Sequence, residues 1–208
     1  AADIAIVAAL LDEKTAKRYK GASEKRDNTT QSPDTYTPTA AELAAVQQAR
    51  EANKEFEKNA ENTKKSWMAW ADKFKIDRNY IEKNAIFQKN GDVIWDGVCD
   101  IDGHELTEFP PNFIEVTGSL YIINNKFRNL EGAPKKIGGD FNCSENKLKN
   151  LQGAPQEIKK RLLCIGNPEL TEGIDGINVG EKVWVSDDQK SLKEDLKRRG
   201  YDVHTYYY

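Results

Sequence analysis

Carboxylates crowd one short segment of the chain and could in principle bind a hard cation. The residues concerned are Asp96, Asp100, Asp102, Glu105 and Glu108. Ca²⁺ prefers such oxygen ligands, but an EF-hand loop needs a glutamate at its twelfth position. Counted from Asp100, that position is Pro111. We therefore interpret the segment as a solvated acidic edge and predict no bound metal.

Histidine and cysteine are the other side chains that could do chemistry. The two histidines, His104 and His204, lie far apart in the sequence, and no Cys/His pair has zinc spacing. Cys143 and Cys164 are 21 residues apart, and buried thiols are favoured there over a disulfide. No nucleophile–base signature, phosphate loop or dinucleotide motif is present. We predict no catalytic residue, no metal ligand and no cofactor, so the chain is not expected to be an enzyme.

Composition excludes two further classes of function. The chain has 208 residues, of which 31% are charged and 38% hydrophobic, with a net charge of -3. The 31 Lys and Arg residues do not cluster as nucleic-acid binding requires. No apolar run approaches the roughly 20 residues of a membrane span. The sequence begins at Ala1 without Met, so a cytoplasmic and a secreted location both stay open.

A repeat of 21 residues dominates the C-terminal half of the chain. Segments 106–126, 127–147 and 148–168 align without gaps. Each alignment column of apolar residues recurs at this spacing: Leu106, Phe127 and Leu148; Phe109, Leu130 and Leu151; Val116, Ile137 and Ile158; Leu120, Phe141 and Leu162; Ile122, Cys143 and Cys164. A polar column contains Asn125, Asn146 and Asn167.

Two degenerate coils flank these three repeats. Cys99 and Ile101 keep the register on the N-terminal side, with His104 in the asparagine column. Val183 and Val185 keep it on the C-terminal side, with Asp188 in that column. The pattern therefore predicts about five coils.

The pattern Leu-x-[Ile/Cys]-x-x-Asn-x-[Leu/Phe]-x-x-Leu resembles the leucine-rich repeat. Its short period is most similar to the 20–22-residue repeats of bacterial leucine-rich-repeat proteins. One departure is Gly-Ala-Pro at 132–134 and 153–155, where secreted effectors usually carry Leu-Pro. The resemblance covers about 93–190 and implies an α/β-type solenoid with short parallel strands.

The physical reading is that each repeat supplies one short strand and a return loop. A single repeat cannot bury its apolar residues, but stacked neighbours form a continuous core. The asparagines are expected to point inward and to hydrogen-bond backbone groups of the turns.

Residues that alternate with the core columns must point the other way, because side chains on a strand alternate. We expect them to line the concave face and to bind a protein partner there. The predicted partner-binding residues are Tyr121, Ile123, Asn142, Leu163, Ile165 and Trp184. The alternative is that residues 1–20 or the long helix fold over this face.

The rest of the chain divides by composition. An amphipathic segment, 1–20, is predicted to dock either on a partner or on the chain itself, and 21–38 is a polar linker. A helical region, 39–84, opens with a capping box at Thr39 and Glu42, followed by a long helix over 40–75. Apolar heptad positions, Phe56 among them, indicate a weak coiled-coil seam, and Trp67, Trp70 and Phe74 are expected to cover the first coil.

The solenoid region, 85–190, is predicted to open with a hairpin cap over 85–97. Asn90-Gly91 suits a type I′ turn. A C-terminal cap, 191–208, should contain a helix over 191–199 and a final strand.

Two hypotheses of function follow. The favoured one is non-enzymatic protein–protein recognition or scaffolding through the solenoid, as the resemblance implies. The alternative is a structural subunit of a larger assembly, attached through helix 40–75 or segment 1–20.

Overall fold

The computed structural model describes residues 39–173 and 175–207. Segment 1–20 and linker 21–38 lie outside the described residues. The chain divides into two compact units, Ala1–Phe56 and Glu57–Tyr208, and each is treated by itself below.

A long helix, α3, runs from Ala40 to Lys73 and ends two residues before the predicted limit. It begins with the predicted capping box. The backbone N–H of Thr39 donates to Glu42 Oε2 (2.8 Å), and the backbone N–H of Glu42 donates to Thr39 Oγ1 (3.3 Å). These bonds satisfy two amides that an isolated helix start leaves unpaired. A short second helix, α4 (Arg78–Asn84), follows after the N-cap residue Asp77.

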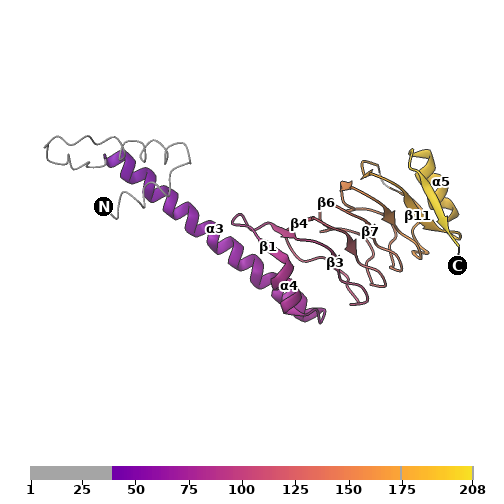
Figure 1. Ribbon diagram of the computed structural model, residues 1–208, viewed down its shortest axis with the longest axis horizontal. Helices are drawn as coiled ribbons and strands as arrows, with labels where there is room; N and C mark the ends of the chain where they lie inside the picture. Colours follow the sequence, from indigo (N-terminus) through magenta and orange to yellow (C-terminus); the bar gives the residue numbers. More distant parts are fainter. Residues whose placement is uncertain (1–38, 174, 208) are drawn as a thin grey trace, which may run out of the picture. The chain divides into compact units, whose positions relative to one another are not determined.

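The second unit is a β-solenoid of about five turns built from two sheets (Figure 1). Sheet A has the order β1-β2-β4-β6-β8-β10. Its strands are Ala85–Phe87, Val93–Trp95, Phe113–Val116, Lys136–Ile137, Glu157–Ile158 and Asn178–Val179. Sheet B has the order β12-β11-β9-β7-β5-β3. Its strands, taken from β3 to β12, are Cys99–Asp100, Leu120–Tyr121, Phe141–Asn142, Leu162–Leu163, Val183–Ser186 and Val203–Tyr206.

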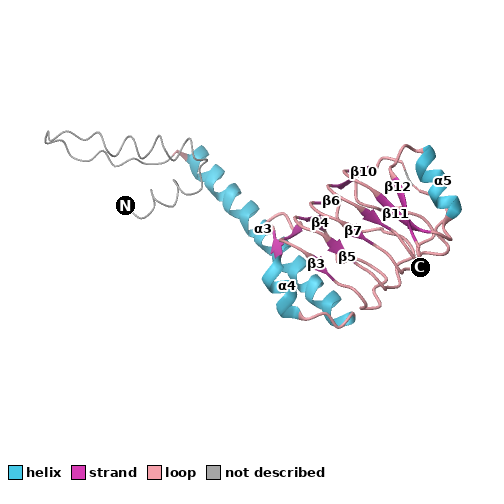
Figure 2. Ribbon diagram, turned by 45° about the vertical axis from the view of Figure 1, so that its right-hand side comes forward, coloured by secondary structure: helices cyan, strands magenta, loops and turns pink. Residues whose placement is uncertain are grey.

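Each coil thus contributes one strand to each sheet, and figures 1 and 2 show these strands stacked coil upon coil. The expectation of a single strand per repeat was wrong. The reason is a tight corner between the two strands of a coil, at which the next coil's backbone approaches closely. At Gly138 a Cβ atom would lie 2.0 Å from Thr117 O. At corners that carry glycine, such as Gly138 and Gly180, the segments on both sides can stack at the ~4.8 Å spacing of paired strands.

The core lies between the two sheets and follows the predicted apolar columns. All fifteen residues of the five aligned columns are buried, with Phe109, at 7%, the most exposed of them. The burial of these columns is therefore confirmed. The parallel register explains it, because Leu120 pairs with Phe141 and Phe141 with Leu162, one repeat length apart each time.

The predicted hairpin is present, but its turn differs from the prediction. β1 pairs antiparallel with β2, with Ala85 opposite Trp95. A type I′ turn needs positive φ at both central residues, whereas only Gly91 (φ 90°) of the Asn90-Gly91 pair has it. The connection is a longer loop, 88–92, in which Asp92 N–H donates to Asn90 Oδ1 (3.1 Å).

Aromatic residues of α3 pack at the first coil. The indole N–H of Trp67 donates to Pro111 O (2.8 Å), and that of Trp70 donates to Glu108 O (3.0 Å). The Trp67 ring also contacts the rings of Trp95 and Phe113. At the other end, α5 (Lys190–Arg198) buries Leu192 and Leu196. Both helices therefore join the same core.

The asparagine column forms a ladder of hydrogen bonds inside the solenoid. Each side-chain Nδ2 donates to a carbonyl of the preceding coil, and each Oδ1 accepts the backbone N–H of a residue that lies 19 positions earlier in the chain. The Nδ2 bonds are Asn125 to Ile101 O (3.0 Å), Asn146 to Ile122 O (2.8 Å) and Asn167 to Cys143 O (3.1 Å). The N–H donors to Oδ1 are Leu106 (2.9 Å), Phe127 (3.1 Å) and Leu148 (3.1 Å).

The ladder ends differently from the prediction on the C-terminal side. Asp188 is exposed, and Gln189 takes the inward place instead. Its Nε2 donates to Cys164 O (3.2 Å) and to Asn167 O (3.0 Å). Cys164 O is the equivalent of Ile101 O, Ile122 O and Cys143 O, and the longer glutamine side chain reaches it from one residue further along. On the N-terminal side, His104 Nδ1 lies 3.3 Å from Phe74 O.

Replacing Asn146 by alanine should destabilise the solenoid. The change removes donors to Ile122 O, Cys143 O and Ser144 O and the acceptor for Phe127 N–H, all without access to water. Leaving buried groups unpaired costs about 1–3 kcal/mol each time a partner is lost. Urea unfolding should show a lower midpoint with an unchanged slope. Asn150→Ala is the control, because the Asn150 side chain is exposed and accepts one bond, from Gln152 N–H. Equal midpoints for both variants would contradict a structural role for the column.

Candidate partner-binding face

The register of sheet B places one side chain from every coil in a single row. Asp100 pairs with Tyr121, Tyr121 with Asn142, Asn142 with Leu163, Leu163 with Trp184, and Trp184 with His204. The residues on either side of Tyr121, Leu163 and Trp184 along their strands include buried core residues. Because successive side chains alternate, this row points away from the core.

Ile123 and Ile165 lie two residues after Tyr121 and Leu163, just beyond the ends of β5 and β9, and each follows a buried residue of the core. The six predicted partner-binding residues therefore lie on one surface, which we call the sheet B face: Tyr121, Ile123, Asn142, Leu163, Ile165 and Trp184. All six are half-buried. Large apolar side chains on three coils thus form a partly exposed surface whose neighbouring strands are ~4.8 Å apart.

Two polar atoms on this face are buried without a hydrogen-bond partner among the described residues. They are Trp184 Nε1 and Ser144 Oγ. The Trp184 ring packs against the His204 ring, with centroids 5.1 Å apart. A buried indole N–H usually finds an acceptor, so the sheet B face carries an unused donor beside its apolar residues.

Sheet A presents a different outward row. Glu115 pairs with Lys136, Lys136 with Glu157, and Glu157 with Asn178. Charges of alternating sign and a terminal amide are typical of a solvated surface. The same repeat thus produces a charged row on one sheet and an apolar row on the other.

An ion pair borders the sheet B face. The guanidinium of Arg161 binds Asp140 through two contacts, Nε to Oδ1 (3.0 Å) and Nη2 to Oδ2 (2.6 Å). This bidentate pairing with Arg161 keeps the pKa of the Asp140 carboxyl below its usual range. The two residues are one repeat length apart, so the 21-residue spacing was a signal from which this pair could have been predicted.

The first coil gives the face an acidic end. Asp102 is half-buried and its Oδ1 accepts the backbone N–H of Ile123. Burial, with the neighbouring carboxylates of Asp100 and Glu145, raises the pKa of the Asp102 carboxyl to about 6. Asp102 is therefore an anion near neutral pH that is held in an unfavourable environment.

The remaining acidic residues of this segment do not converge. Glu105 pairs with Lys126 (2.8 Å), Glu108 pairs with Lys73 (2.7 Å), and Asp96 accepts the Thr117 hydroxyl (3.1 Å). Over residues 39–173 and 175–207, no group of three or more His, Cys, Asp or Glu side chains is placed to hold a metal ion.

The three cysteines are free and buried. Burial raises the pKa of the Cys164 thiol to about 12, and it also raises the pKa values of Cys99 and Cys143. Since the thiolate is the nucleophile and the metal ligand, these thiols are unreactive near neutral pH. They act as small apolar residues of the core.

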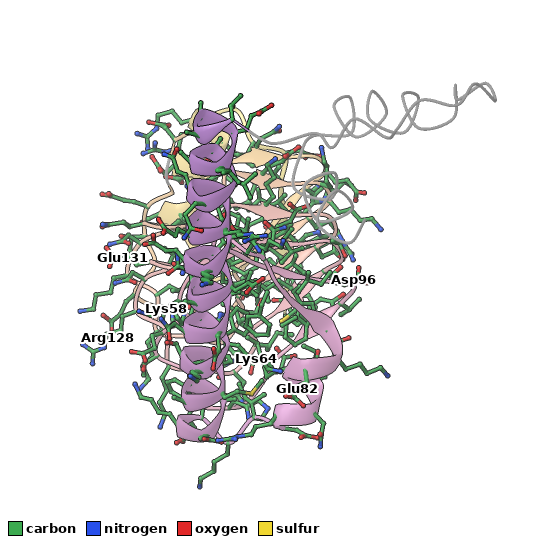
Figure 3. The ribbon with its side chains drawn as sticks, turned by 90° about the vertical axis from the view of Figure 1, so that its left-hand side faces the viewer. Lys58, Lys64, Glu82, Asp96, Arg128 and Glu131 are labelled. Carbon is green, nitrogen blue, oxygen red and sulfur yellow. The ribbon has the colours of Figure 1, made fainter. Side chains whose placement is uncertain are left out.

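A shallow groove of about 450 Å³ runs between α3 and α4, lined by Met68 and charged residues. Its charges are paired: Lys64 with Glu82 (3.0 Å), Lys65 with Glu61 (2.7 Å), and Arg78 with Asp72. Figure 3 shows Lys64 on α3 and Glu82 on α4 close together. These ion pairs lower the pKa values of the Glu61 and Asp72 carboxyls and raise that of Arg78, so each of these groups is held in its charged form.

Comparison with protein-family models, with curated proteins and with solved structures found no match for this chain. Among the described helices, none is both long and apolar enough to cross a membrane.

Asp102→Asn should raise stability at pH 7 to 8, and the gain should vanish in acid. The folded pKa, about 6, lies above the ordinary 3.8. The folded state therefore binds a proton that the unfolded state releases, so wild-type stability rises as pH falls through 6 toward 4. Asparagine has no charge to bury and can keep the bond from Ile123 N–H. Melting temperatures measured from pH 4 to 8 should converge at the acidic end. A difference that stays constant across this range would contradict the burial of an unfavourable anion.

Proposed function

We propose that this chain is a non-enzymatic protein of the leucine-rich-repeat type that recognises or scaffolds protein partners through the sheet B face. The observation that carries the proposal is the row Tyr121, Leu163 and Trp184. This row places aromatic and aliphatic side chains on the outer surface of sheet B. The corresponding outward row of sheet A carries charged side chains instead. Contiguous apolar surface usually marks an interaction site, and aromatic residues dominate the energetics of such interfaces.

The leucine-rich-repeat assignment is supported by the inward asparagines at a 21-residue spacing and by the parallel coils. In this proposal α3 and α5 serve as the caps that a solenoid needs on its open ends. The buried contacts of Trp67 and Trp70 at one end, and of Leu192 and Leu196 at the other, support that role. The bacterial affiliation rests on the short repeat alone.

The partner that fits this face is a protein surface with apolar side chains. A basic group opposite Asp100 and Asp102 would neutralise the acidic end. No cofactor is part of the proposal.

A photo-crosslinking amino acid tests the proposal in the cells that produce the chain. Placed at Tyr121 or Leu163, it should capture a discrete partner, while at Lys136 on the outward row of sheet A it should not. Lys136 lies on the coil between those of Tyr121 and Leu163 and differs from both in the sheet that carries it. Adding Trp184→Ser to the Leu163 probe should abolish capture with little change in melting temperature. Equal capture from Lys136, or loss of stability without loss of capture, would contradict recognition through the sheet B face.

A second candidate function, a structural subunit attached through the long helix, is favoured by one observation. Phe56 lies on the predicted heptad seam of α3 and is 44% exposed. If α3 drives assembly, Phe56→Glu should dissociate it, since a buried charge in a coiled-coil seam is costly. Light scattering on the full chain measures the mass. Glu55→Gln, next to Phe56 but off the seam, is the control and should leave the mass unchanged. A monomer in both variants and in the parent removes this alternative.

A further inference from the structure

The outer edge of β12 offers backbone groups that sheet B leaves without a neighbouring strand in the described residues. In every earlier coil, the amides at two equivalent positions donate forward to the next coil. In β9 and just after it, Leu162 N–H donates to Lys182 O (3.0 Å) and Cys164 N–H donates to Trp184 O (3.0 Å).

The same two positions on β12 are Val203 and Thr205. The register shows this, because Val183 pairs with Leu162 on one side and with Val203 on the other, and Val185 pairs with Thr205. Their N–H groups therefore point off the end of the sheet. The bonds that hold β12 to β11 use other atoms of the strand, such as Asp202 O and Tyr206 O, which accept from Val183 and Asp187 N–H.

The opposite edge of sheet B is closed by a side chain. The Asp100 N–H on β3 donates to the Tyr80 hydroxyl (2.8 Å), which in turn donates to Val98 O (3.3 Å). Tyr80 comes from α4. One end of the sheet thus has its outward backbone groups satisfied, whereas the other presents a strand edge.

β12 also lacks the usual protection of an exposed edge. Proteins commonly blunt such edges with lysine, proline or a bulge. The sequence of β12 is Val-His-Thr-Tyr, and its pairing with β11 runs through four residues without a register shift. Tyr206 and the following Tyr207 are 49% and 73% exposed, so apolar ring surface lies next to the edge.

Positive charge lies beside this edge. Lys193 of α5 hydrogen-bonds the Thr205 hydroxyl, which places the helix against β12. The helix sequence, KSLKEDLKR, carries four basic residues and two acidic ones. Of the acidic pair, Asp195 is already bound by Arg198 (3.2 Å) and Arg199 (2.6 Å). An incoming strand would therefore meet a net positive helix.

We propose that the edge of β12 binds an extended, acidic protein segment by strand addition. Backbone bonds to Val203 and Thr205 supply affinity that does not depend on sequence, while the lysines of α5 select a segment rich in carboxylates. A second copy of the chain fits less well, because pairing β12 with itself would bring two basic α5 helices together. This site is separate from the sheet B face.

Two capped synthetic peptides serve as probes, one alternating glutamate with valine and one alternating lysine with valine. On the full chain at low salt, the glutamate peptide should slow hydrogen exchange at Val203 and Thr205. It should also bind roughly tenfold or more tightly than the lysine peptide, a difference of about 1.4 kcal/mol. Tyr121→Ser with Leu163→Ser, on strands that do not pair with β12, should leave this binding unchanged, which separates the edge from the sheet B face.

Thr205→Pro is the decisive variant. Proline removes an outward amide and is tolerated on an edge strand whose N–H faces away from the sheet. Affinity for the glutamate peptide should fall roughly tenfold, whereas Thr205→Ser keeps both the amide and the hydroxyl that bonds Lys193 and should bind as the parent does. Should Thr205→Pro prove unstable, Lys193→Glu with Lys197→Glu should instead abolish the preference for the glutamate peptide.

Three outcomes would overturn the proposal. The first is unchanged exchange at Val203 and Thr205 with saturating glutamate peptide. The second is equal affinity for the two peptides. The third is a dimer, seen by light scattering, in which both amides are already protected without peptide, because the edge would then be occupied by a second copy.

Discussion

The solenoid depends on a hydrogen bond that spans two coils: an asparagine amide inside the core that satisfies backbone groups of its own coil and of the one before. Turns between stacked strands bury carbonyls and amides that cannot reach another strand. Asn146 alone bonds Ile122 O, Cys143 O, Ser144 O and Phe127 N–H. Burial of such groups without partners would oppose the burial of the apolar columns. The apolar residues drive the coils together, and the asparagines make that burial compatible with the backbone's need for partners.

The parts of the fold that repeat could be predicted from the sequence, because repetition converts one weak signal into several aligned ones. The core columns and the inward asparagines recur at 21 residues. Features that occur once could not be read in this way. Gln189 closes the ladder from one residue outside its column, and the Tyr80 hydroxyl closes the edge of β3. The second strand of each coil was missed for another reason. Strands as short as Lys136–Ile137 show too few residues for a period of two to be recognised.

The outward residues of the candidate site were identifiable for the same reason as the core, since alternation fixes their direction once the core columns are known. Their surroundings were not. The raised pKa of Asp102 depends on burial and on the carboxylates of Asp100 and Glu145, of which Glu145 lies two coils away from Asp102. The unpaired indole N–H of Trp184 depends on how neighbouring side chains cover it. Sequence spacing places residues on a face, but only packing determines which of their polar atoms lack a partner.

A solenoid differs from a closed domain in that each of its sheets has two open edges. A strand of a parallel sheet both donates and accepts on each side, so the first and the last strand each leave amides and carbonyls without a partner strand. In sheet B the Tyr80 hydroxyl resolves the first end, since it can both accept from Asp100 and donate to Val98. At the other end, β12 provides an acceptor for Val183 N–H through Asp202 O. The equivalent N–H of β12 itself, that of Val203, then has no further strand of the sheet to bond. Adding strands can never satisfy the last one. The forward end of such a sheet must therefore be met by water, by a side chain or by another polypeptide, and the basic helix beside β12 favours an acidic polypeptide.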